Sequence, residues 1–381
     1  MGAMTLWQVA QRSTSVIGIE RFEPGHARGS SHGGSRIFRR IGTEGAHYVP
    51  LARRADELWD RLQNQSRTRL RIITGGLTIG TSGGDYIASA LAAAEAGDVD
   101  VELLDAAQLR RRFGQHAVCE DDVAVYEPGA GVLLPETAIR AAVEQAVAHG
   151  AQIRSGEHVR SVASDGDAVT IETSAATVRA RRAVVATGAW LTDLLPQLDL
   201  PIRVQRSVPY WFDASPEEFG PTAFPVFRRR SGHLSGWGVP DVDGRGVKIG
   251  VSAAPKPWLR RPEDNWVAEG EADLGLVRRF VAEAFPGLRH AAASAHPCMN
   301  ARTPDGDFVI GTTPRAPGVV VLGGFGGSGF KHAAAVGEIA ADLVFDDEPH
   351  VPIAAFSPAR LSVQRWTTPL EPVFGGTSAH Q

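Results

Sequence analysis

The sequence predicts a two-domain α/β protein, and three observations support that prediction. The chain has 381 residues, which is long for a single domain. A short apolar strand, residues 15–20, ends in an acid before a loop of small and polar residues. Near the other end, a second apolar strand at 319–322 runs through a glycine-rich turn into a helix. Strand–turn–helix units of this kind are typical of nucleotide-binding domains, because the turn and the helix N-terminus can approach phosphate.

The acid at the end of the first strand indicates the kind of nucleotide-binding unit to which the strand belongs. In a dinucleotide-binding βαβ unit, the second strand ends in Asp or Glu, which binds the ribose hydroxyls. Glu20 follows Gly2 by 18 residues, close to the usual spacing of about 20 between the glycine fingerprint and the acid. We therefore interpret Gly2 as the third glycine of GxGxxG, with a helix at 5–11 behind it. The first strand and the first two glycines are then absent from this sequence.

Such a first strand would be central in a doubly wound sheet. Its loss leaves both neighbours without a hydrogen-bonding ladder and removes the backbone that meets the pyrophosphate. We favour a misplaced start codon or a clipped chain over a viable enzyme built without the strand. The alternative is a degenerate protein that no longer binds its nucleotide. The upstream codons distinguish the two: a strand followed by GxG supports the first, and a stop codon supports the second.

The remaining elements alternate in a way that predicts one domain built from three separated segments. Apolar periodicity predicts helices at 49–65, 85–96, 105–113, 135–149, 264–285 and 333–345. Strands are predicted at 15–20, where the strand is buried, and at 152–155, 158–163, 168–173 and 179–186, with a mainly antiparallel sheet over 203–251. The predicted nucleotide-binding domain comprises 1–70, 132–202 and 303–381, and the inserted substrate domain comprises 71–131 and 203–302.

Composition excludes several classes of function. A net charge of −4 and a pI near 6.3 give no electrostatic case for binding nucleic acid. No apolar run approaches the roughly 20 residues of a membrane span, and no signal peptide is visible, so we expect a cytoplasmic protein. The two cysteines, Cys119 and Cys298, are too few for a disulfide framework and lack metal-ligand spacing. No metal is expected.

Lysine is scarce in this chain. Only Lys248, Lys256 and Lys331 are lysines, and the other 36 basic residues are arginines. This bias reflects the coding composition of the source, so each lysine can be a chance survivor. The other interpretation is that a lysine persists where a compact ammonium fits and a planar guanidinium does not.

Seven sequence blocks occur in the order found in one enzyme family. They are GHARGSSHGGSRIFR, EGAHYVPLARRADELW, YEPGAGVL, ATGAW, VKIG, CMNARTPDGDFVIG and GGFGGSGFKHAAAVGE. In these blocks the chain resembles the FAD-dependent amine oxidases, and most closely their monomeric sarcosine oxidase and N-methyltryptophan oxidase group. The resemblance implies a glutathione-reductase-like, Rossmann-type FAD-binding domain with an inserted α+β substrate domain dominated by an antiparallel sheet.

The resemblance also implies the reacting residues. Cys298 matches the cysteine that carries the flavin through a thioether bond, and attack by that sulfur is helped by nearby cations. Lys248 matches the lysine that promotes oxygen reduction, where an ammonium stabilises developing negative charge. Arg39 and Lys331 match the pair that binds the substrate carboxylate, for which arginine supplies a bidentate fork.

Further matches imply the cofactor contacts. Glu20 matches the acid on the adenosine ribose, while His32 and Arg36 match residues that line the flavin. The remaining implied contacts are Gly2, Ser31, Val159, Gly188, Gly327 and Gly329. Without the resemblance, the residues leave other roles open: a structural cysteine at 298, a surface arginine at 39, a lysine at 331 that compensates a carboxylate, and a satisfied loop histidine at 32.

The departures from the family pattern concern the substrate. Where sarcosine oxidases have two histidines and a tyrosine, this chain has Ser252, Ser328 and Gly42, and the usual Cys-Met-Tyr-Thr is CMNA at 298–301. Small residues thus replace ring-bearing ones. We expect a larger pocket that takes a bulkier N-alkyl or cyclic amino acid rather than sarcosine.

The predicted reaction is oxidation of the C–N bond of a secondary amino acid by hydride transfer to FAD. Water hydrolyses the imine, and O₂ reoxidises the flavin to give H₂O₂. The expected partners are therefore a small amino acid and O₂, and a monomer is expected. The alternatives are flavin-dependent desaturation of a cyclic imino acid in biosynthesis and a truncated, non-catalytic remnant that binds a partner.

Overall fold

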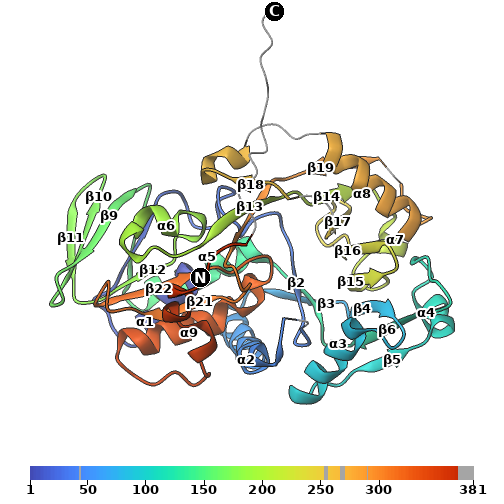
Figure 1. The fold of residues 1–381 in the computed structure, drawn as a ribbon, viewed down its shortest axis with the longest axis horizontal. Coiled ribbons are helices and arrows are strands. Elements are labelled where there is room, and N and C mark those ends of the chain that lie inside the picture. Colours follow the sequence, from blue (N-terminus) through green and yellow to red (C-terminus); the bar gives the residue numbers. More distant parts are fainter. Residues whose placement is uncertain (43, 253–255, 267–270, 290, 368–381) are drawn as a thin grey trace, which may run out of the picture.

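The computed structural model describes residues 1–42, 44–252, 256–266, 271–289 and 291–367, and only the backbone of 266 and 271–273. The first and last helices lie together on the left of the view, and the largest sheet lies on the right (Figure 1). The cavity described below is lined by residues from both groups.

The N-terminal helix is packed among two later helices. α1 (Gly2–Ala10) lies against α9 (Ala333–Val344) and α5 (Pro135–Ala148). A Cβ added to Gly337 would come within 2.6 Å of the Met4 backbone, so only glycine allows α1 and α9 to approach this closely. The N-terminal helix is thereby fixed by segments more than 120 residues away.

α2 (Val49–Ser66) contacts α9 as well. Its buried face includes Leu51, Leu58 and Leu62 at helical spacing, which confirms the helix predicted from the apolar pattern. Pro50 occupies the first turn, where a missing N–H costs nothing.

The parallel strands beside these helices fall into two separate sheets. β1 (Ile17–Glu20) pairs in parallel with β8 (Gln152–Ser155). β12 (Ala183–Val185) pairs in parallel with β22 (Val319–Gly323), which continues antiparallel to β21 (Val309–Thr312). Among the described strands, β1 pairs only with β8, and β12 only with β22. Residues of both strands line one cavity.

This separation into two sheets corrects one prediction. The strand at 15–20 was predicted to be buried, but Ile17 is 38% exposed and the rest of β1 is only half-buried. The physical reason is that β1 borders the cavity and has one described strand beside it instead of two.

The largest sheet has eight strands and is almost wholly antiparallel, as predicted. Of its described strands, only β4 and β15 pair in parallel. Its order is β19 (Ala292–Ala295), β14 (Tyr210–Phe212), β17 (Val247–Val251), β16 (Leu234–Val239), β15 (Val226–Ser231), β4 (Gly76–Thr81), β6 (Asp122–Glu127) and β5 (Glu102–Leu104).

One face of this sheet carries an apolar core. Phe212, Phe227 and Ile249 of the sheet pack with Phe280 and Phe285, at and just after the end of α8 (Glu271–Ala284). The opposite face, where side chains alternate outward, is left for the cavity: Trp211, Arg228 and Lys248 all line it.

Three small sheets and several short helices complete the fold. The sheets are β11 (Thr177–Ala180), β10 (Val169–Thr173) and β9 (Val159–Ser164); β18 (Trp258–Leu259), β13 (Arg203–Ser207) and β20 (Cys298–Arg302); and β2 (Arg36–Phe38), β7 (Gly131–Leu133) and β3 (Arg71–Ile73). The other α-helices are α3 (Asp85–Ala96), α4 (Ala106–Arg112), α6 (Leu191–Leu194) and α7 (Pro216–Phe219). The 3₁₀ turns are η1 (Ala46–Tyr48), η2 (Gly188–Trp190), η3 (Pro196–Leu198), η4 (Pro262–Trp266), η5 (Gly329–His332), η6 (Ala354–Phe356) and η7 (Pro358–Ser362).

Two element predictions were wrong in their extent. The single strand predicted at 179–186 is two strands in different sheets, β11 and β12, separated at Arg181 and Arg182. The guanidinium of Arg182 there pairs with Asp346 at 2.9 Å. The helix predicted at 264–285 is α8, preceded by η4, and its predicted residues 267–270 lie outside the described residues. The predicted domain boundaries stay a prediction.

In the part of the chain that the structure describes, no helix has the length and apolar character needed to cross a membrane.

Candidate active site

A cavity of about 1930 Å³ opens between the two groups of elements. Typical ligand pockets measure roughly 300–1,000 Å³, so this one has room for a large cofactor together with a substrate. All thirteen residues predicted for the site line it: Gly2, Glu20, Ser31, His32, Arg36, Arg39, Val159, Gly188, Lys248, Cys298, Gly327, Gly329 and Lys331. The fold therefore brings together positions that are spread over more than 300 residues of sequence.

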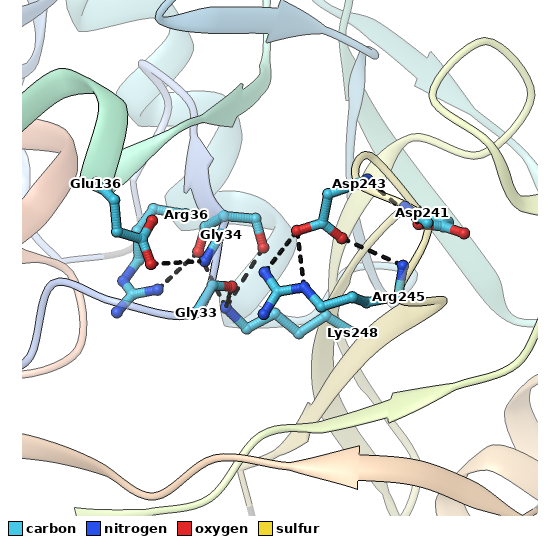
Figure 2. A network of polar contacts seen from close by, with 10 residues as sticks. Gly33, Gly34, Arg36, Glu136, Asp241, Asp243, Arg245 and Lys248 are labelled. Carbon is cyan, nitrogen blue, oxygen red and sulfur yellow. Dashed lines mark hydrogen bonds and ion pairs between the residues drawn. The ribbon is translucent and has the colours of Figure 1, made fainter. Parts of the chain in front are cut away.

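Lys248 reaches across the cavity wall to the glycine-rich loop. From β17, its Nζ donates to the carbonyl oxygens of Gly33 at 3.1 Å and Ser35 at 3.0 Å. Figure 2 shows this contact, with Glu136 and Arg36 on the other side of the loop. The ammonium also lies 4.9 Å from the ring centre of Trp211. Burial, followed by repulsion from Arg36, holds the pKa of Lys248 well below its usual value.

The loop itself depends on two glycines in the left-handed region. Gly33 has φ +90°, and a Cβ there would lie 3.4 Å from Lys248 Nζ. Gly34 has φ +73°, and a Cβ there would collide with the Asp243–Arg245 ion pair. The Gly34 amide donates to Glu136 Oε1 at 3.1 Å (Figure 2), so the loop is fixed through its backbone.

Cys298 stands at the start of β20 beside the same loop. Its Sγ lies 4.0 Å from Arg36 Nη2 and 3.7 Å from the Ser30 carbonyl oxygen. Arg36 in turn donates to the carbonyl oxygens of Ser35 at 2.7 Å and Ser30 at 2.6 Å, which orients its guanidinium. A guanidinium in this position stabilises negative charge that develops on the sulfur during attack on an electrophile.

His32 is buried between these groups. Burial is the main cause of a pKa lowered to about 4, with repulsion from Arg36 and Lys248 adding to it. The ring is therefore neutral at physiological pH. Its Nε2 is buried without a hydrogen-bond partner among the described residues, so this nitrogen remains available to a bound molecule.

At the far end of the cavity lie Glu20 and the start of α1. Glu20 Oε1 accepts from the Phe22 amide at 2.9 Å and lies 3.5 Å from His26 Nε2. Gly2 approaches Ala186, just beyond β12. The amino group of Met1 is buried beside it, and this burial lowers its pKa to about 6. Between these points Val159 and Gly188 complete the wall.

The predicted carboxylate-binding pair surrounds a residue that sequence analysis missed. Glu44 Oε1 lies 3.4 Å from Arg39 Nη2, 3.5 Å from Lys331 Nζ and 3.6 Å from Arg228 Nη1. Burial opposes the charge of Glu44, but Lys331, Arg39 and Arg228 outweigh it and hold its pKa well below the usual range. For Lys331, burial outweighs Glu44 and lowers the pKa to about 8.

Three further cavity residues, Arg228, Lys256 and Arg302, were also missed. One signal was present in the sequence, because Lys256 is one of only three lysines and all three line this cavity. A second was the run Arg228-Arg229-Arg230 within a predicted strand, whose alternation must turn charge toward both faces of the sheet. Among the described residues, no group of three or more His, Cys, Asp or Glu is placed to hold a metal ion.

The fold and the cavity define an α/β protein with a large internal cavity, one part of which is lined by a cluster of cations. The family model described as "FAD dependent oxidoreductase" matches residues 1–343, and the chain belongs to that family. This confirms the predicted family, fold class and FAD dependence, and the chain is an oxidoreductase.

Named relatives agree with this assignment. The chain is 33% identical to the monomeric sarcosine oxidase of Streptomyces avermitilis, covering 95% of each chain. It is 30% identical to the N-methyl-L-tryptophan oxidase of Yersinia pestis, covering 94% of this chain and 96% of that one. Among solved structures, a Tyr258Phe mutant of NikD, an amino acid oxidase of nikkomycin biosynthesis, superposes with a TM-score of 0.82 at 24% identity, covering 93% of this chain and 94% of that one.

Proposed function

We propose that the chain oxidises the C–N bond of a secondary amino acid, with FAD as hydride acceptor and O₂ reduced to H₂O₂. The observation that carries this proposal is the buried pair Arg39 and Lys331. Both cations lie within 3.5 Å of the same carboxylate oxygen, Glu44 Oε1, so they converge on one point of the cavity wall. The site shares a cavity with Lys248 and Cys298. Relatives named for N-methyl amino acids, at 30% and 33% identity, support the same class of substrate.

The residues present fit an FAD. Glu20 stands where the ribose would bind, the start of α1 faces the cavity, and His32 offers a buried ring nitrogen without a partner among the described residues. When bound, the flavin accepts a hydride and later passes the electrons to O₂. We propose that Cys298 Sγ would carry the flavin through a thioether bond to its 8-methyl group, with Arg36 beside the sulfur. The sulfur would replace one hydrogen of that methyl group, and the thiol and the methyl group would each lose a proton. The two electrons released would pass through the flavin to O₂.

Each cation would have a separate task. Arg39 and Lys331 hold the substrate carboxylate and so fix the position of the adjacent C–N bond. Lys248, pinned by the carbonyl oxygens at 33 and 35, places a positive charge inside the cavity. There it stabilises the negative charge that builds on oxygen during its reduction, and its lowered pKa eases release of a proton to that oxygen.

The walls of the substrate end support a bulky substrate. Ser252 and Ser328 both line the cavity, whereas the space beside Gly42 is already filled by the carboxylate of Glu44. We propose an N-alkyl or cyclic amino acid larger than sarcosine. A monomer located in the cytoplasm remains the expected state of the protein.

The test combines turnover with the fate of the flavin. The purified protein, supplied with FAD, should release H₂O₂ and aldehyde from an N-methyl amino acid with a bulky side chain, at a higher kcat/KM than from sarcosine. Peroxide without aldehyde would instead indicate desaturation of a cyclic substrate. Absence of peroxide with every secondary amino acid, from protein that holds flavin, would overturn the proposal.

The flavin linkage is tested separately. Acid-precipitated wild-type protein should stay yellow, whereas Cys298→Ser should release its flavin into the supernatant. Cys119→Ser is the matched control, because Cys119 is exposed and does not line the cavity. A yellow precipitate from Cys298→Ser would rule out the proposed bond.

A further inference from the structure

The substrate end of the cavity carries more positive charge than one carboxylate requires. Besides Arg39 and Lys331, it is lined by Arg228, Lys256 and Arg302. Arg228 projects from β15 of the large sheet, and Arg302 ends β20 of a smaller one. Five cations thus reach one cavity from separate segments of the chain.

Lys256 and Arg302 are neighbours on either side of β13. The Lys256 carbonyl oxygen accepts from Gln205 Nε2 at 3.0 Å. Arg302 pairs with Arg203, two residues before Gln205 on the same strand. All three side chains, Lys256, Arg302 and Arg228, line the same cavity. Burial lowers the pKa of Lys256, and repulsion from Arg302 and Arg228 lowers it further.

The protein leaves much of this positive charge without a counter-ion. In the described part of the chain, the carboxylate that pairs with Arg228 is Glu44, which is already shared with Arg39 and Lys331. Among the described residues, no acidic side chain pairs with Lys256 or Arg302, and Arg302 Nε is buried without a hydrogen-bond partner. Partly buried, like-charged groups without counter-ions are costly unless a ligand supplies the opposite charge.

We propose that the substrate carries a second acidic group, which Lys256, Arg302 and Arg228 bind. This inference rests on the proposed function. Arg39 and Lys331 hold the carboxylate next to the reacting C–N bond. The substrate class is then N-alkyl or cyclic amino acids with an anionic side chain or N-substituent. This assignment gives a role to the small residues Ser252 and Ser328, which line the same cavity as the three cations, since the added room would be occupied by a charged substituent.

Binding tests this without turnover. Calorimetry on the holoenzyme would compare glutarate with glutaramate, and succinate with succinamate, pairs that differ by one carboxylate turned into an amide. We expect the dicarboxylate to bind about tenfold more tightly or better, as one charge-assisted contact implies. Equal affinities within both pairs would overturn the inference.

Kinetics then locate the second group. The wild-type protein should prefer N-methyl-L-glutamate or N-methyl-L-aspartate over the matching amide, and this ratio should fall toward one in Lys256→Gln and Arg302→Gln. Arg260→Gln is the control, because Arg260 is exposed nearby and does not line the cavity. An unchanged ratio in both cavity variants, or the same fall in Arg260→Gln, would contradict the assignment.

Three outcomes distinguish a second anion site from a phosphate site and from failure of the reaction itself. If the cluster instead bound cofactor phosphates, both cavity variants would lose FAD absorbance while keeping the acid-to-amide ratio, and the second anion site would be ruled out. If dicarboxylates bind tightly but no secondary amino acid is oxidised, the proposed reaction fails and the second anion site stands. If amide and acid react equally well, the reaction stands and the second site fails.

Discussion

At the residue scale, burial and neighbouring charges shift the pKa values of the site residues to different extents. Glu44 is somewhat more exposed than Lys331, and the carboxylate is strongly held in its charged form whereas the ammonium is not. The reason is that Glu44 faces three cations, whereas Lys331 faces one carboxylate and two arginines. Lys331 is therefore the group that changes charge first as the pH rises.

This asymmetry predicts a pH dependence of carboxylate binding. With a pKa of about 8, Lys331 is protonated below that pH and loses its charge above it. The Kd for propionate, a ligand that does not itself titrate in this range, should rise by up to about fivefold between pH 8 and pH 9. Calorimetry measures this directly. Lys331→Arg should flatten the profile, because arginine keeps its proton, and the same rise in that variant would contradict the assignment.

The lowered pKa of Lys331 also makes the free energy of unfolding depend on pH. The pKa of Lys331 is lower in the folded protein than its ordinary value of 10.5. Between about pH 8 and 10.5 the unfolded chain therefore holds the extra proton, and the free energy of unfolding rises with pH. Lys331 thus costs stability at neutral pH, where its charge serves binding.

Some residues of this site could be predicted from the sequence, and others could not. Cys298, Lys248 and Lys331 stand in recognisable blocks, so their place in the cavity could be predicted. Arg228 could not, because it meets Glu44 only after β15 has paired with β4 across some 150 residues of chain. Local patterns do not encode contacts of that kind.

At the scale of elements, α1 and α9 pack closely because residue 337 of α9 is a glycine. The Cβ of an alanine at 337 would lie 2.6 Å from the Met4 carbonyl carbon and 2.7 Å from its oxygen. Both are backbone atoms of a buried helix and cannot move aside. Gly337→Ala should therefore destabilise the protein by about 1–3 kcal/mol, the usual range for overpacking.

Thermal denaturation of two glycine variants tests this. In Gly275→Ala, on an exposed part of α8 with no atom within 4 Å of the new Cβ, the same exchange should stabilise by up to about 1 kcal/mol. A melting temperature for Gly337→Ala at or above that of the wild type would show that α1 can shift, contrary to the packing described.

A second element-scale contact ties β15 to the start of β6. Arg229 Nη2 donates to Asp122 Oδ2 at 2.7 Å, and both side chains are fully buried. Asp122 also accepts from Ser231, and Arg229 Nη1 donates to the Ala117 carbonyl oxygen at 2.6 Å. Because Arg229 and Arg228 face opposite sides of the sheet, this pair fixes the strand that presents Arg228 to the cavity.

Arg229→Met should cost about 3–5 kcal/mol, because it leaves the buried Asp122 carboxylate without a counter-charge. Urea denaturation measures the loss. Arg179→Met, which removes an exposed ion pair with Asp165, should leave the denaturation midpoint unchanged. Equal midpoints for the two variants would mean that Asp122 finds another partner.

Elements also differ in how far the sequence could predict them. α2 and α5 have strong apolar periodicity and a proline in the first turn, and their bounds match the predictions closely. The segment 179–186 was predicted as one strand, but its halves join different sheets. Sheet membership depends on tertiary pairing, which a local pattern does not contain.

At the scale of the whole molecule, the cavity is bordered by two sheets of very different size, the two-stranded sheet of β1 and β8 and the eight-stranded sheet. β1 has one described neighbour and borders the cavity, whereas β4 lies within an eight-stranded sheet. A two-stranded sheet is marginal alone, so β1 and β8 belong to the weakly held part of the protein. A ligand that spans the cavity would bind only the arrangement in which both sides are in place.

Hydrogen exchange should reveal this division. In Cys298→Ser protein freed of flavin, so that the cofactor can bind reversibly, amides of β1 should exchange much faster than those of β4. FAD at 100 times its Kd should add up to about 2.7 kcal/mol of protection around β1, since ligand binds the folded form alone. Glu20 is proposed to hold the adenosine ribose, so FMN, which lacks adenosine, should protect the loop at 29–36 and leave β1 nearly unchanged. Equal protection of β1 by FMN and FAD would remove Glu20 from the cofactor site, and fast exchange in β4 would contradict the proposed difference between the two sheets.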